Sequence, residues 1–421
     1  MLNYEKYTLD NGLNVILNPT SSETIDTLIS VRHGALNERE HEHGIAHFLE
    51  HNLILGGGSR HKPSEIKNKL SYYGNWNAGT NLNRTLFNAG FVKDMFEEYL
   101  DLFSDTIFNP AFDENILEQE RKRVLREIPL RSQESPAVEE YYEAMFGKNN
   151  PYRYKVIGNA SIIEKANAQD LYEFYERGYV AQNTDLIIVG SIPKNAIKLI
   201  EKYFGNIKTG TKSEIILPNT IPLNKRFIKH VGTLDPNEKN SNNSLADIVI
   251  TLPTDAINSL DSPKISVFNN ILGGDPHSKL HEKISEELGL SYSIKSSYDC
   301  SYNWGEVNIR GTLHVDALDK GIDAIFDIFK HLQEYPVGER EIQRIKNTWE
   351  YFMYKRMETN EGILDTISKE IDHNINFYER IEKIKNCTAQ DVQDMARKYT
   401  PSSFQDKFLM FISDPTKEKE V

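Results

Sequence analysis

The stretch Ala168-Gln169-Asp170-Leu171 returns in the second half of the chain as Ala389-Gln390-Asp391-Val392. The two strings lie 221 positions apart (389 minus 168), about half of the 421 residues. Each opens a helical pattern that ends at a tyrosine, and an apolar, strand-like run follows each pattern, at 186–190 and at 408–412. The acidic residue in the first turn of each pattern favours a capped helix start. A match of string, spacing and following strand predicts that the chain is a duplication.

The N-terminal residues predict a β-hairpin. The strand-like runs 7–9 and 13–17 flank Asn11-Gly12, which supplies the positive φ that a tight turn needs. A third run follows at 27–31, and long helical patterns interrupted by strands come after it. This order is typical of α+β proteins rather than of regular βαβ alternation. We therefore expect two homologous α+β domains, each with an antiparallel sheet and helices.

A polar connector separates the two halves. Residues 209–225 include Pro218 and Pro222 and few apolar residues, a composition that suits an exposed linker. We expect a first domain at 1–208, this linker at 209–225 and a second domain at 226–421.

The composition excludes several classes of protein. Lys and Arg number 49 against 62 Asp and Glu, so the net charge of −13 would repel nucleic acid. Only two cysteines, Cys300 and Cys387, are present, which excludes a disulfide framework and a cysteine-rich metal site. No apolar run reaches the ~18 residues of a membrane span, and the N-terminus lacks the pattern of a signal peptide. We expect a soluble, cytoplasmic protein.

Six of the twelve histidines lie between His33 and His61. Within this cluster, His47-Phe48-Leu49-Glu50-His51 places two imidazoles four residues apart on one helix face, where both can bind one metal ion. Glu50 points into the same space and can act as a general base, which makes the motif the inverse of His-Glu-x-x-His. The alternative is a purely structural histidine pair. His41 and His43, just ahead of this helix, are expected to be exposed loop residues.

A catalytic zinc site needs a third protein ligand, which should come from another element. The segment 113–128 reads as a long helix, in which Glu120 and Glu127 are seven residues apart and share a face. Glu127 stands at the edge of an apolar stripe and is the better candidate ligand. The alternative is that Glu127 pairs with an arginine on a neighbouring turn, such as Arg123 or Arg126.

His47-x-x-Glu50-His51 followed by Glu120 and Glu127 resembles the motif set of the inverzincin zinc metallopeptidases, the family of pitrilysin, insulin-degrading enzyme and the mitochondrial processing peptidase. His51 and Glu127 are 76 positions apart (127 minus 51), the spacing that this family shows. The length and the two halves are similar to those of its short bacterial, processing-peptidase-like subunits. Three further stretches look like family motifs, at 75–80, 150–158 and 288–292.

The resemblance implies a zinc metalloendopeptidase that holds one Zn²⁺ per chain. It assigns His47, His51 and Glu127 as the zinc ligands. Glu50 is implied as the base that acts on water. Glu120 is implied as a residue that orients a ligand histidine, because a ligating imidazole usually donates its other N–H to an oxygen.

The resemblance also extends to the substrate and to assembly. Asn77 and Ala78 would bind the backbone of a peptide by β-addition, and Tyr292 would be a catalytic residue that contacts the scissile region. Two chains would enclose a clam-shell chamber that holds short or unfolded peptides. The sequence leaves open whether such an enzyme degrades peptides generally or matures one peptide.

One position departs from the family pattern. Members carry an arginine seven residues before the tyrosine that Tyr292 matches, and this chain has Ser285 there. No arginine occurs between Arg226 and Arg310, so a shifted alignment does not supply one. A hydroxyl cannot replace the forked, charged donor of a guanidinium. We therefore expect the zinc-bearing subunit of a heterodimer whose homologous partner supplies the arginine; a self-sufficient homodimer and a catalytically silent scaffold are the alternatives.

Overall fold

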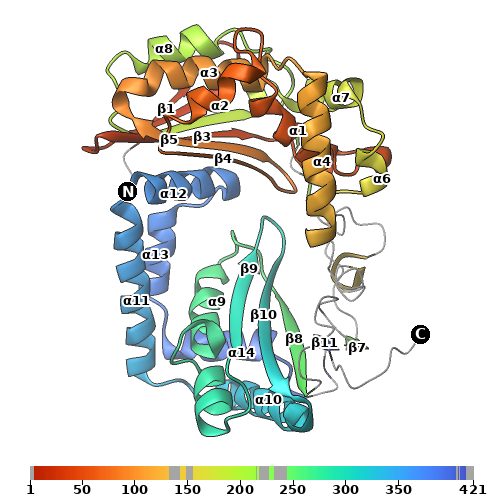
Figure 1. Ribbon diagram of the computed structural model, residues 1–421. Coiled ribbons are helices and arrows are strands. Elements are labelled where there is room, and N and C mark those ends of the chain that lie inside the picture. Colours follow the sequence, from red (N-terminus) through yellow and green to blue (C-terminus); the bar gives the residue numbers. More distant parts are fainter. Residues whose placement is uncertain are drawn as a thin grey trace. The chain divides into compact units, whose positions relative to one another are not determined.

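The computed structural model describes residues 4–131, 143–147, 155–214, 216–217, 227–231, 244–403, 406 and 408–413. Within it the chain forms two compact units (Figure 1). The first consists of Met1–Ser132, Tyr154–Ile216 and Arg356–Ser368, and the second of Gln133–Arg153, Leu217–Lys355 and Lys369–Val421. A short segment from the second half of the sequence therefore belongs to the first unit.

The first unit is built on a six-stranded sheet in the order β1-β2-β6-β3-β5-β4. Neighbouring strands run antiparallel, except for β2 and β6, which run parallel. The strands are β1 (Glu5–Thr8), β2 (Asn14–Pro19), β3 (Thr24–Val31), β4 (Asn75–Thr80), β5 (Thr85–Val92) and β6 (Thr184–Gly190). β1 and β2 form the predicted hairpin, in which Gly12 turns the chain with a φ of 91°. β4 is an edge strand of this sheet.

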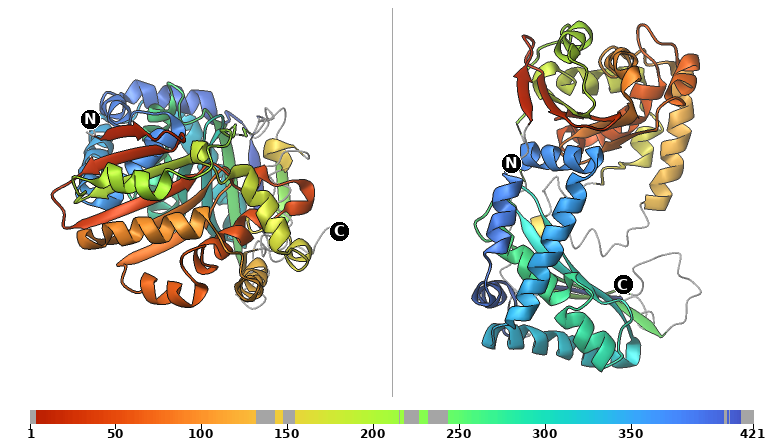
Figure 2. Two further views of the ribbon diagram at one scale, coloured as in Figure 1. Left: turned by 90° about the horizontal axis from the view of Figure 1, so that it is seen from above. Right: turned by 90° about the vertical axis from the view of Figure 1, so that its left-hand side faces the viewer.

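Helices cover the first sheet. α3 (Phe96–Phe108) and α8 (Ala196–Phe204) pack together over one of its faces, which the view from above also shows (Figure 2). The unit also contains α1 (Ile45–Leu55), α2 (Pro63–Leu70), α4 (Glu114–Arg131), α6 (Ala160–Ile163) and α7 (Ala168–Gly178). Short 3₁₀ turns occur at Ala35–Asn37, Glu40–Glu42, Lys93–Met95 and Ala181–Asn183. α1 packs against α4, so the two segments that carry the predicted metal ligands lie side by side.

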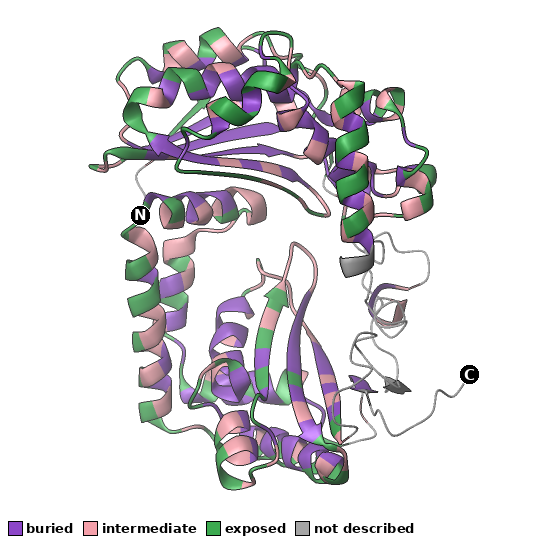
Figure 3. Cartoon of the chain, viewed as in Figure 1, coloured by how far each residue is buried: buried purple, intermediate pink, exposed green. Residues whose placement is uncertain are grey.

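The core of the first unit lies between the sheet and these helices (Figure 3). Its largest fully buried side chains are aromatic, among them Phe48, Phe87, Tyr99 and Phe103. β6 is buried along its whole length and has neighbours on both sides within the sheet. Its residues 186–189 form an apolar run, whereas Thr184 and Asp185 at its start are buried polar residues.

α12 (Asn360–His373) begins in the segment that joins the first unit. Asn360 is buried there, and its side chain accepts a hydrogen bond from Thr20 Oγ1 at 2.9 Å. The same side chain donates to the carbonyl of Thr24 at 3.2 Å. These bonds tie the first turn of α12 to the segment between β2 and β3 and to the start of β3.

The second unit contains a five-stranded sheet in the order β7-β11-β8-β10-β9. Its strands are β7 (Phe227–Val231), β8 (Leu245–Thr254), β9 (Lys295–Cys300), β10 (Gly305–His314) and β11 (Leu409–Ser413). Its helices are α9 (Ser262–Asn269), α10 (Leu318–Glu334), α11 (Glu339–Met357), α13 (Phe377–Lys385) and α14 (Ala389–Tyr399), with π-helical turns at Asn270–Gly274 and His281–Glu287 and a 3₁₀ turn at Val315–Ala317. None of the described helices of either unit is long and apolar enough to cross a lipid bilayer.

The two units share one topology. The order β2-β6-β3-β5-β4 in the first matches β7-β11-β8-β10-β9 in the second, and in each the last strand of the unit runs parallel to the first of these five. α7 and α14 begin at 168 and 389, as predicted, and each opens with a capping box, Asn167 with Asp170 and Thr388 with Asp391. The predicted α+β class and the two similar domains are confirmed. The sheets are not wholly antiparallel as expected, because in each unit the last strand pairs in parallel with one of its two neighbours.

The exact domain boundaries stay a prediction, because residues 215 and 218–226 of the connector region lie outside the described residues. The described start of the connector is attached to the first unit. The carbonyls of Lys208 and Thr209 accept hydrogen bonds from the N–H groups of Ala181 and Gln182 at 2.8 and 3.1 Å.

Candidate metal centre

The N-terminal end of α1, the helix that carries both histidines, is fixed by several contacts. Gly44 precedes the helix with a φ of 103°, and a Cβ there would lie 2.9 Å from Cα of Gly158, so only glycine fits. The Glu38 carboxylate accepts hydrogen bonds from the N–H groups of Gly44 and Ala46 at 3.0 and 2.8 Å. A negative group therefore stands at the positive end of the helix.

α1 is almost wholly buried, and Phe48 and Leu49 face the core, as predicted. Because the core fixes those two side chains, the orientation of the opposite face is fixed as well. His47 and His51 lie together on that face, with ring centroids 4.7 Å apart.

α4 presents a carboxylate to both imidazoles. Glu127 Oε2 lies 3.9 Å from His47 Nε2, and Glu127 Oε1 lies 3.8 Å from His51 Nε2. One ligand atom from each of the three residues lies within 4.8 Å of the other two. No other trio of His, Cys, Asp and Glu residues comes this close in the part of the chain that the structure describes.

The three donors fit a zinc ion. Tetrahedral zinc with bonds of about 2.0–2.1 Å has ligand atoms about 3.3 Å apart. One donor atom from each of the three residues lies within 4.8 Å of the other two, so side-chain rotations can bring the three donors onto one ion. Two imidazoles and one carboxylate are also the donor set of hydrolytic zinc sites, which leave one position open.

Arg123 and Arg126, the two arginines considered as partners for Glu127, bond to other groups. Arg123 Nη1 donates to Glu120 Oε1 at 2.7 Å, and Arg126 Nε donates to the carbonyl of Lys122 at 2.9 Å. Glu127 faces the two imidazoles instead.

Glu120 lies behind His51. Glu120 Oε2 is 3.1 Å from His51 Nδ1, and the glutamate side chain is buried. With the ring N–H at Nδ1 donating to this carboxylate, the lone pair at Nε2 points toward Glu127. Burial lowers the pKa of His51, but the Glu120 hydrogen bond and the charges of Glu50 and Glu127 outweigh it, and the pKa is raised.

Glu50 is held by the strand beside it. Its Oε2 accepts a hydrogen bond from Thr80 Oγ1 at 2.9 Å. Burial raises the pKa of the Glu50 carboxyl, and the opposing effects of His51 and Thr80 do not cancel that rise. A carboxyl whose pKa moves toward neutrality is better suited to exchange protons at neutral pH.

These side chains line a pocket of about 360 Å³. Residues 76–80 of β4 also line it, so Asn77 and Ala78 lie in the same pocket as the two histidines. Because β4 is an edge strand, backbone groups on its outer side can pair with an added peptide.

Among the polar and charged side chains that line this pocket, those of Thr80 and Arg123 were not predicted from the sequence to belong to it. Thr80 ends the stretch 75–80, which looks like a family motif, yet the sequence assigned it no role; the period of two that places it on the face of Ala78 was the available signal. Arg123 was considered only as a partner for Glu127, and the structure places it at the pocket wall, bonded to Glu120.

The remaining predicted residues lie elsewhere. Tyr292 belongs to the second unit, and its side chain is 98% exposed. Ser285 lies in the π-helical turn His281–Glu287, and its Oγ is buried without a hydrogen-bond partner among the described residues. The roles given to this position and to Tyr292 stay predictions. Residues 150–154 of the predicted loop lie outside the described residues.

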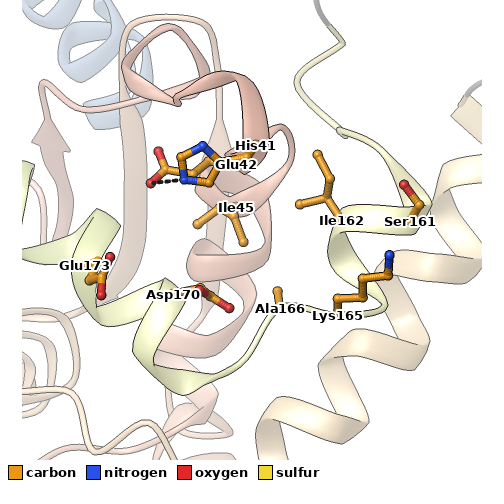
Figure 4. A pocket seen from close by; sticks show the side chains of 9 residues that line it. All are labelled: His41, Glu42, Ile45, Ser161, Ile162, Lys165, Ala166, Asp170 and Glu173. Atoms are coloured by element: carbon orange, nitrogen blue, oxygen red, sulfur yellow. Dashed lines mark ion pairs between the residues drawn. The ribbon is translucent and has the colours of Figure 1, made fainter.

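A second pocket, of about 240 Å³, lies at the N-terminal end of α1 (Figure 4). His41 lines it with a side chain that is 75% exposed, as predicted, and its Nε2 lies 4.0 Å from Glu42 Oε1. His43 differs from the prediction: its side chain is only 19% exposed, because its ring packs toward the buried Glu38 carboxylate at 3.6 Å. Neither histidine belongs to the trio on α1 and α4.

Comparison with known proteins identifies relatives of this chain. Residues 14–160 match the family model "Insulinase (Peptidase family M16)", and residues 165–348 match "Peptidase M16 inactive domain". The chain is 25% identical to the uncharacterized zinc protease YmxG of Bacillus subtilis, over 81% of each chain. It is 23% identical to the mitochondrial-processing peptidase subunit beta of Caenorhabditis elegans, over 93% of this chain and 86% of that one.

Two further comparisons bear on fold and activity. A protease from Helicobacter pylori has the same fold, with a TM-score of 0.83 and 19% identity over 99% of this chain and 100% of that one. The probable inactive metalloprotease YmfF of Bacillus subtilis is 23% identical over 72% of each chain. Both family models describe peptidase M16 domains, one in each half and in sequence order. The chain therefore belongs to peptidase family M16.

Proposed function

We propose that this chain is a zinc metalloendopeptidase that cleaves short or unfolded peptides. His47, His51 and Glu127 bind one Zn²⁺ per chain, and Glu50 is the general base. The observation that carries the proposal is the approach of Glu127 to both imidazoles, at 3.8 and 3.9 Å, beside the buried Glu50 carboxyl. Family membership supports it, because relatives of this chain bear the name zinc protease.

Each side chain has a chemical task in this proposal. Zinc, when bound, polarises the scissile carbonyl and lowers the pKa of a water toward ~7. Glu50 takes the proton at Oε1, because Oε2 already accepts the Thr80 hydroxyl, and later delivers it to the leaving amine. Glu120 keeps the His51 ring in the orientation that leaves Nε2 available.

The substrate binds along β4. A peptide added to this edge strand is held through its main chain, and Asn77 and Ala78 lie where such a peptide meets the pocket. Because backbone hydrogen bonds do not depend on the side chains of the substrate, this mode of binding suits unfolded peptides of varied sequence. Tyr292, from the second unit, is proposed to contact the scissile region.

The chain is proposed to act as the zinc-bearing subunit of a heterodimer. Ser285 stands where an arginine is expected, so a homologous partner supplies the guanidinium. A relative named as one subunit of a processing peptidase supports this assembly. A homodimer that works without the arginine is the alternative.

A second candidate function is that of a silent scaffold. The relative named as a probable inactive metalloprotease favours it. The clustering of His47, His51 and Glu127 with Glu50 argues against it, because a scaffold has no need of this set.

The experiment is a hydrolysis assay on a diverse mixture of unstructured peptides, with the chain alone and with a co-expressed homologous partner. We expect cleavage that a chelator abolishes, that added zinc restores, and that Glu50→Gln lacks. Cleavage that survives chelation, or a zinc-loaded complex that cuts no peptide, would overturn the proposal.

A further inference from the structure

Arg123 is a cation within an acidic pocket. Its side chain is 44% exposed, and it lines the same pocket as the two histidines and the edge strand. The pocket also contains the carboxyl groups of Glu50, Glu120 and Glu127. Among the described residues that line it, Arg123 is the one lysine or arginine.

Only part of the Arg123 guanidinium is engaged in a hydrogen bond within the described part of the chain. Arg123 Nη1 donates to Glu120 Oε1 at 2.7 Å, while Glu120 Oε2 lies 3.1 Å from His51 Nδ1. One buried carboxylate thus fixes both the histidine and the arginine. A guanidinium carries five N–H donors in a planar fork, and the described structure gives Arg123 no other hydrogen bond or ion pair within the chain. The remaining donors face solvent or the pocket.

We propose that Arg123 is a specificity-determining residue that binds a carboxylate of the peptide substrate, an aspartate or glutamate close to the scissile bond. This inference rests on the proposed peptidase function and names the substrate class that its site prefers. A planar fork with free N–H groups binds carboxylates bidentately. Glu120 already holds the side chain, so less conformational entropy is lost when the substrate binds.

A purely structural role makes a different prediction. Arg123 and Glu120 form an i,i+3 ion pair on α4, in which the arginine is partly exposed and the glutamate is buried. Its loss would alter zinc retention or thermal stability, but would leave the choice of peptide unchanged. Cleavage-site preference therefore separates the two roles.

The test uses the zinc-loaded full chain, with its partner subunit if activity requires it, and a library of random-sequence peptides whose cleavage sites are read by mass spectrometry. For the native protein we expect Asp and Glu to be enriched at one position beside the cleaved bond. Arg123→Glu should abolish this enrichment and favour Lys or Arg there. For two peptides that differ by Glu or Lys at that position, the native preference in kcat/KM should be about 10-fold, the size of one hydrogen bond to a charged group.

Lys122→Glu is the matched control, because it makes the same charge change one residue away and outside the pocket lining. It should keep the native preference. Zinc content is measured for each variant, and if Arg123→Glu loses the metal, Arg123→Gln replaces it and should abolish the acidic enrichment. Native cleavage without acidic enrichment, or enrichment that Arg123→Glu or Arg123→Gln retains, would overturn the inference while leaving the peptidase function intact.

The absence of any cleavage would defeat the proposed function, and cleavage sites could then not be compared. A binding measurement tests the inference about Arg123 in that case as well. Zinc-loaded Glu50→Gln is titrated with two fluorescent pools of random decapeptides, one of them made without Asp and Glu. Tighter binding of the acid-containing pool, lost in Glu50→Gln/Arg123→Gln, supports the inference. Equal binding of the two pools contradicts it.

Discussion

His51 Nδ1 lies 3.1 Å from a carboxylate oxygen of Glu120, while Nε2 of the same ring faces Glu127 at 3.8 Å. The imidazole is therefore held between two carboxylates with different tasks. In the proposed site the first fixes the ring and its tautomer, and the second would bind the same zinc ion as the ring.

The two carboxylates should differ in their effect on zinc. Glu127→Ala removes a ligand and should lose most of the metal during dialysis. Glu120→Ala removes only a partner of a ligand and should weaken zinc affinity by about 10- to 100-fold. Zinc content after dialysis at one pH measures this. Equal content in both variants would remove the distinction, and the reverse order would exchange the two assignments.

Glu50→Gln should keep its zinc and lose peptide hydrolysis, because it removes the base and spares the ligands. The loss of a general base costs about 10²–10⁴ in rate. His51→Ala is the contrasting variant and should lose the metal itself. Near-normal turnover by Glu50→Gln would show that the base lies elsewhere.

Thr80 should matter through the position of Glu50. Thr80→Val keeps the shape of the side chain and removes the hydroxyl that donates to Glu50 Oε2. We expect kcat to fall about 10-fold, the size of one hydrogen bond to a charged group, with KM and zinc content unchanged. Thr80→Ser should restore kcat. A fall in zinc content or thermal stability without a selective effect on kcat would mean that the hydroxyl has only a structural role.

Local patterns were sufficient to predict much of the fold. α7 and α14 begin where the repeated string places them, because a capping residue and an acidic first turn fix a helix start within a few residues. The hairpin at Gly12 follows from the same kind of local signal. The position of Asn360 could not be predicted, because its bond to Thr20 spans 340 residues and nothing near it in sequence marks the contact.

The candidate site could also be predicted only in part from the sequence. His47 and His51 share a helix face at a fixed spacing, so their proximity could be predicted from sequence alone. Glu127 was one candidate among alternatives until the family resemblance selected it. The place of Arg123 depends on how α4 packs beside α1 and β4, which no local pattern specifies.

The ion pair between Glu42 and Arg177 should make stability depend on pH. Burial raises the pKa of Glu42, but two hydrogen bonds from Arg177, at 2.6 and 3.1 Å, and one from the Arg39 N–H hold it below its usual value. A depressed carboxyl pKa gives stability that is present above the unfolded-state pKa of about 4.3 and is lost as pH falls through the folded-state value.

Glu42→Gln should therefore lower the melting temperature at pH 7, by about 2–4 °C for each kcal/mol of unfolding free energy that is lost. The difference in melting temperature between the variant and the native protein should become smaller below about pH 4. Glu40→Gln, at an exposed position in the same turn, is the control and should show no gap. A gap for Glu42→Gln that stays constant down to acid pH would mean that the charge of Glu42 is not the source of the stabilisation.

The presence of Ser285 at the position where an arginine is expected leads to a prediction about assembly. If the proposed heterodimer is correct, the purified chain alone should cleave its physiological peptide poorly, because Ser285 supplies no guanidinium to a transition-state oxyanion, a loss of about 10²–10³ in rate. Co-expression with a homologous partner should restore cleavage, and mutation of the partner's arginine should abolish it again. Robust zinc-dependent cleavage by the lone chain would favour the homodimer.

The metal content of the purified chain tests the central claim most directly. Elemental analysis of the native protein, beside His47→Ala and Glu127→Ala, requires no knowledge of the substrate or of a partner. We expect one zinc per native chain and far less in either variant. Native protein that binds well under one zinc per chain when zinc is supplied, or variants that keep as much zinc as the native protein, would contradict the assignment of His47, His51 and Glu127 as the metal site.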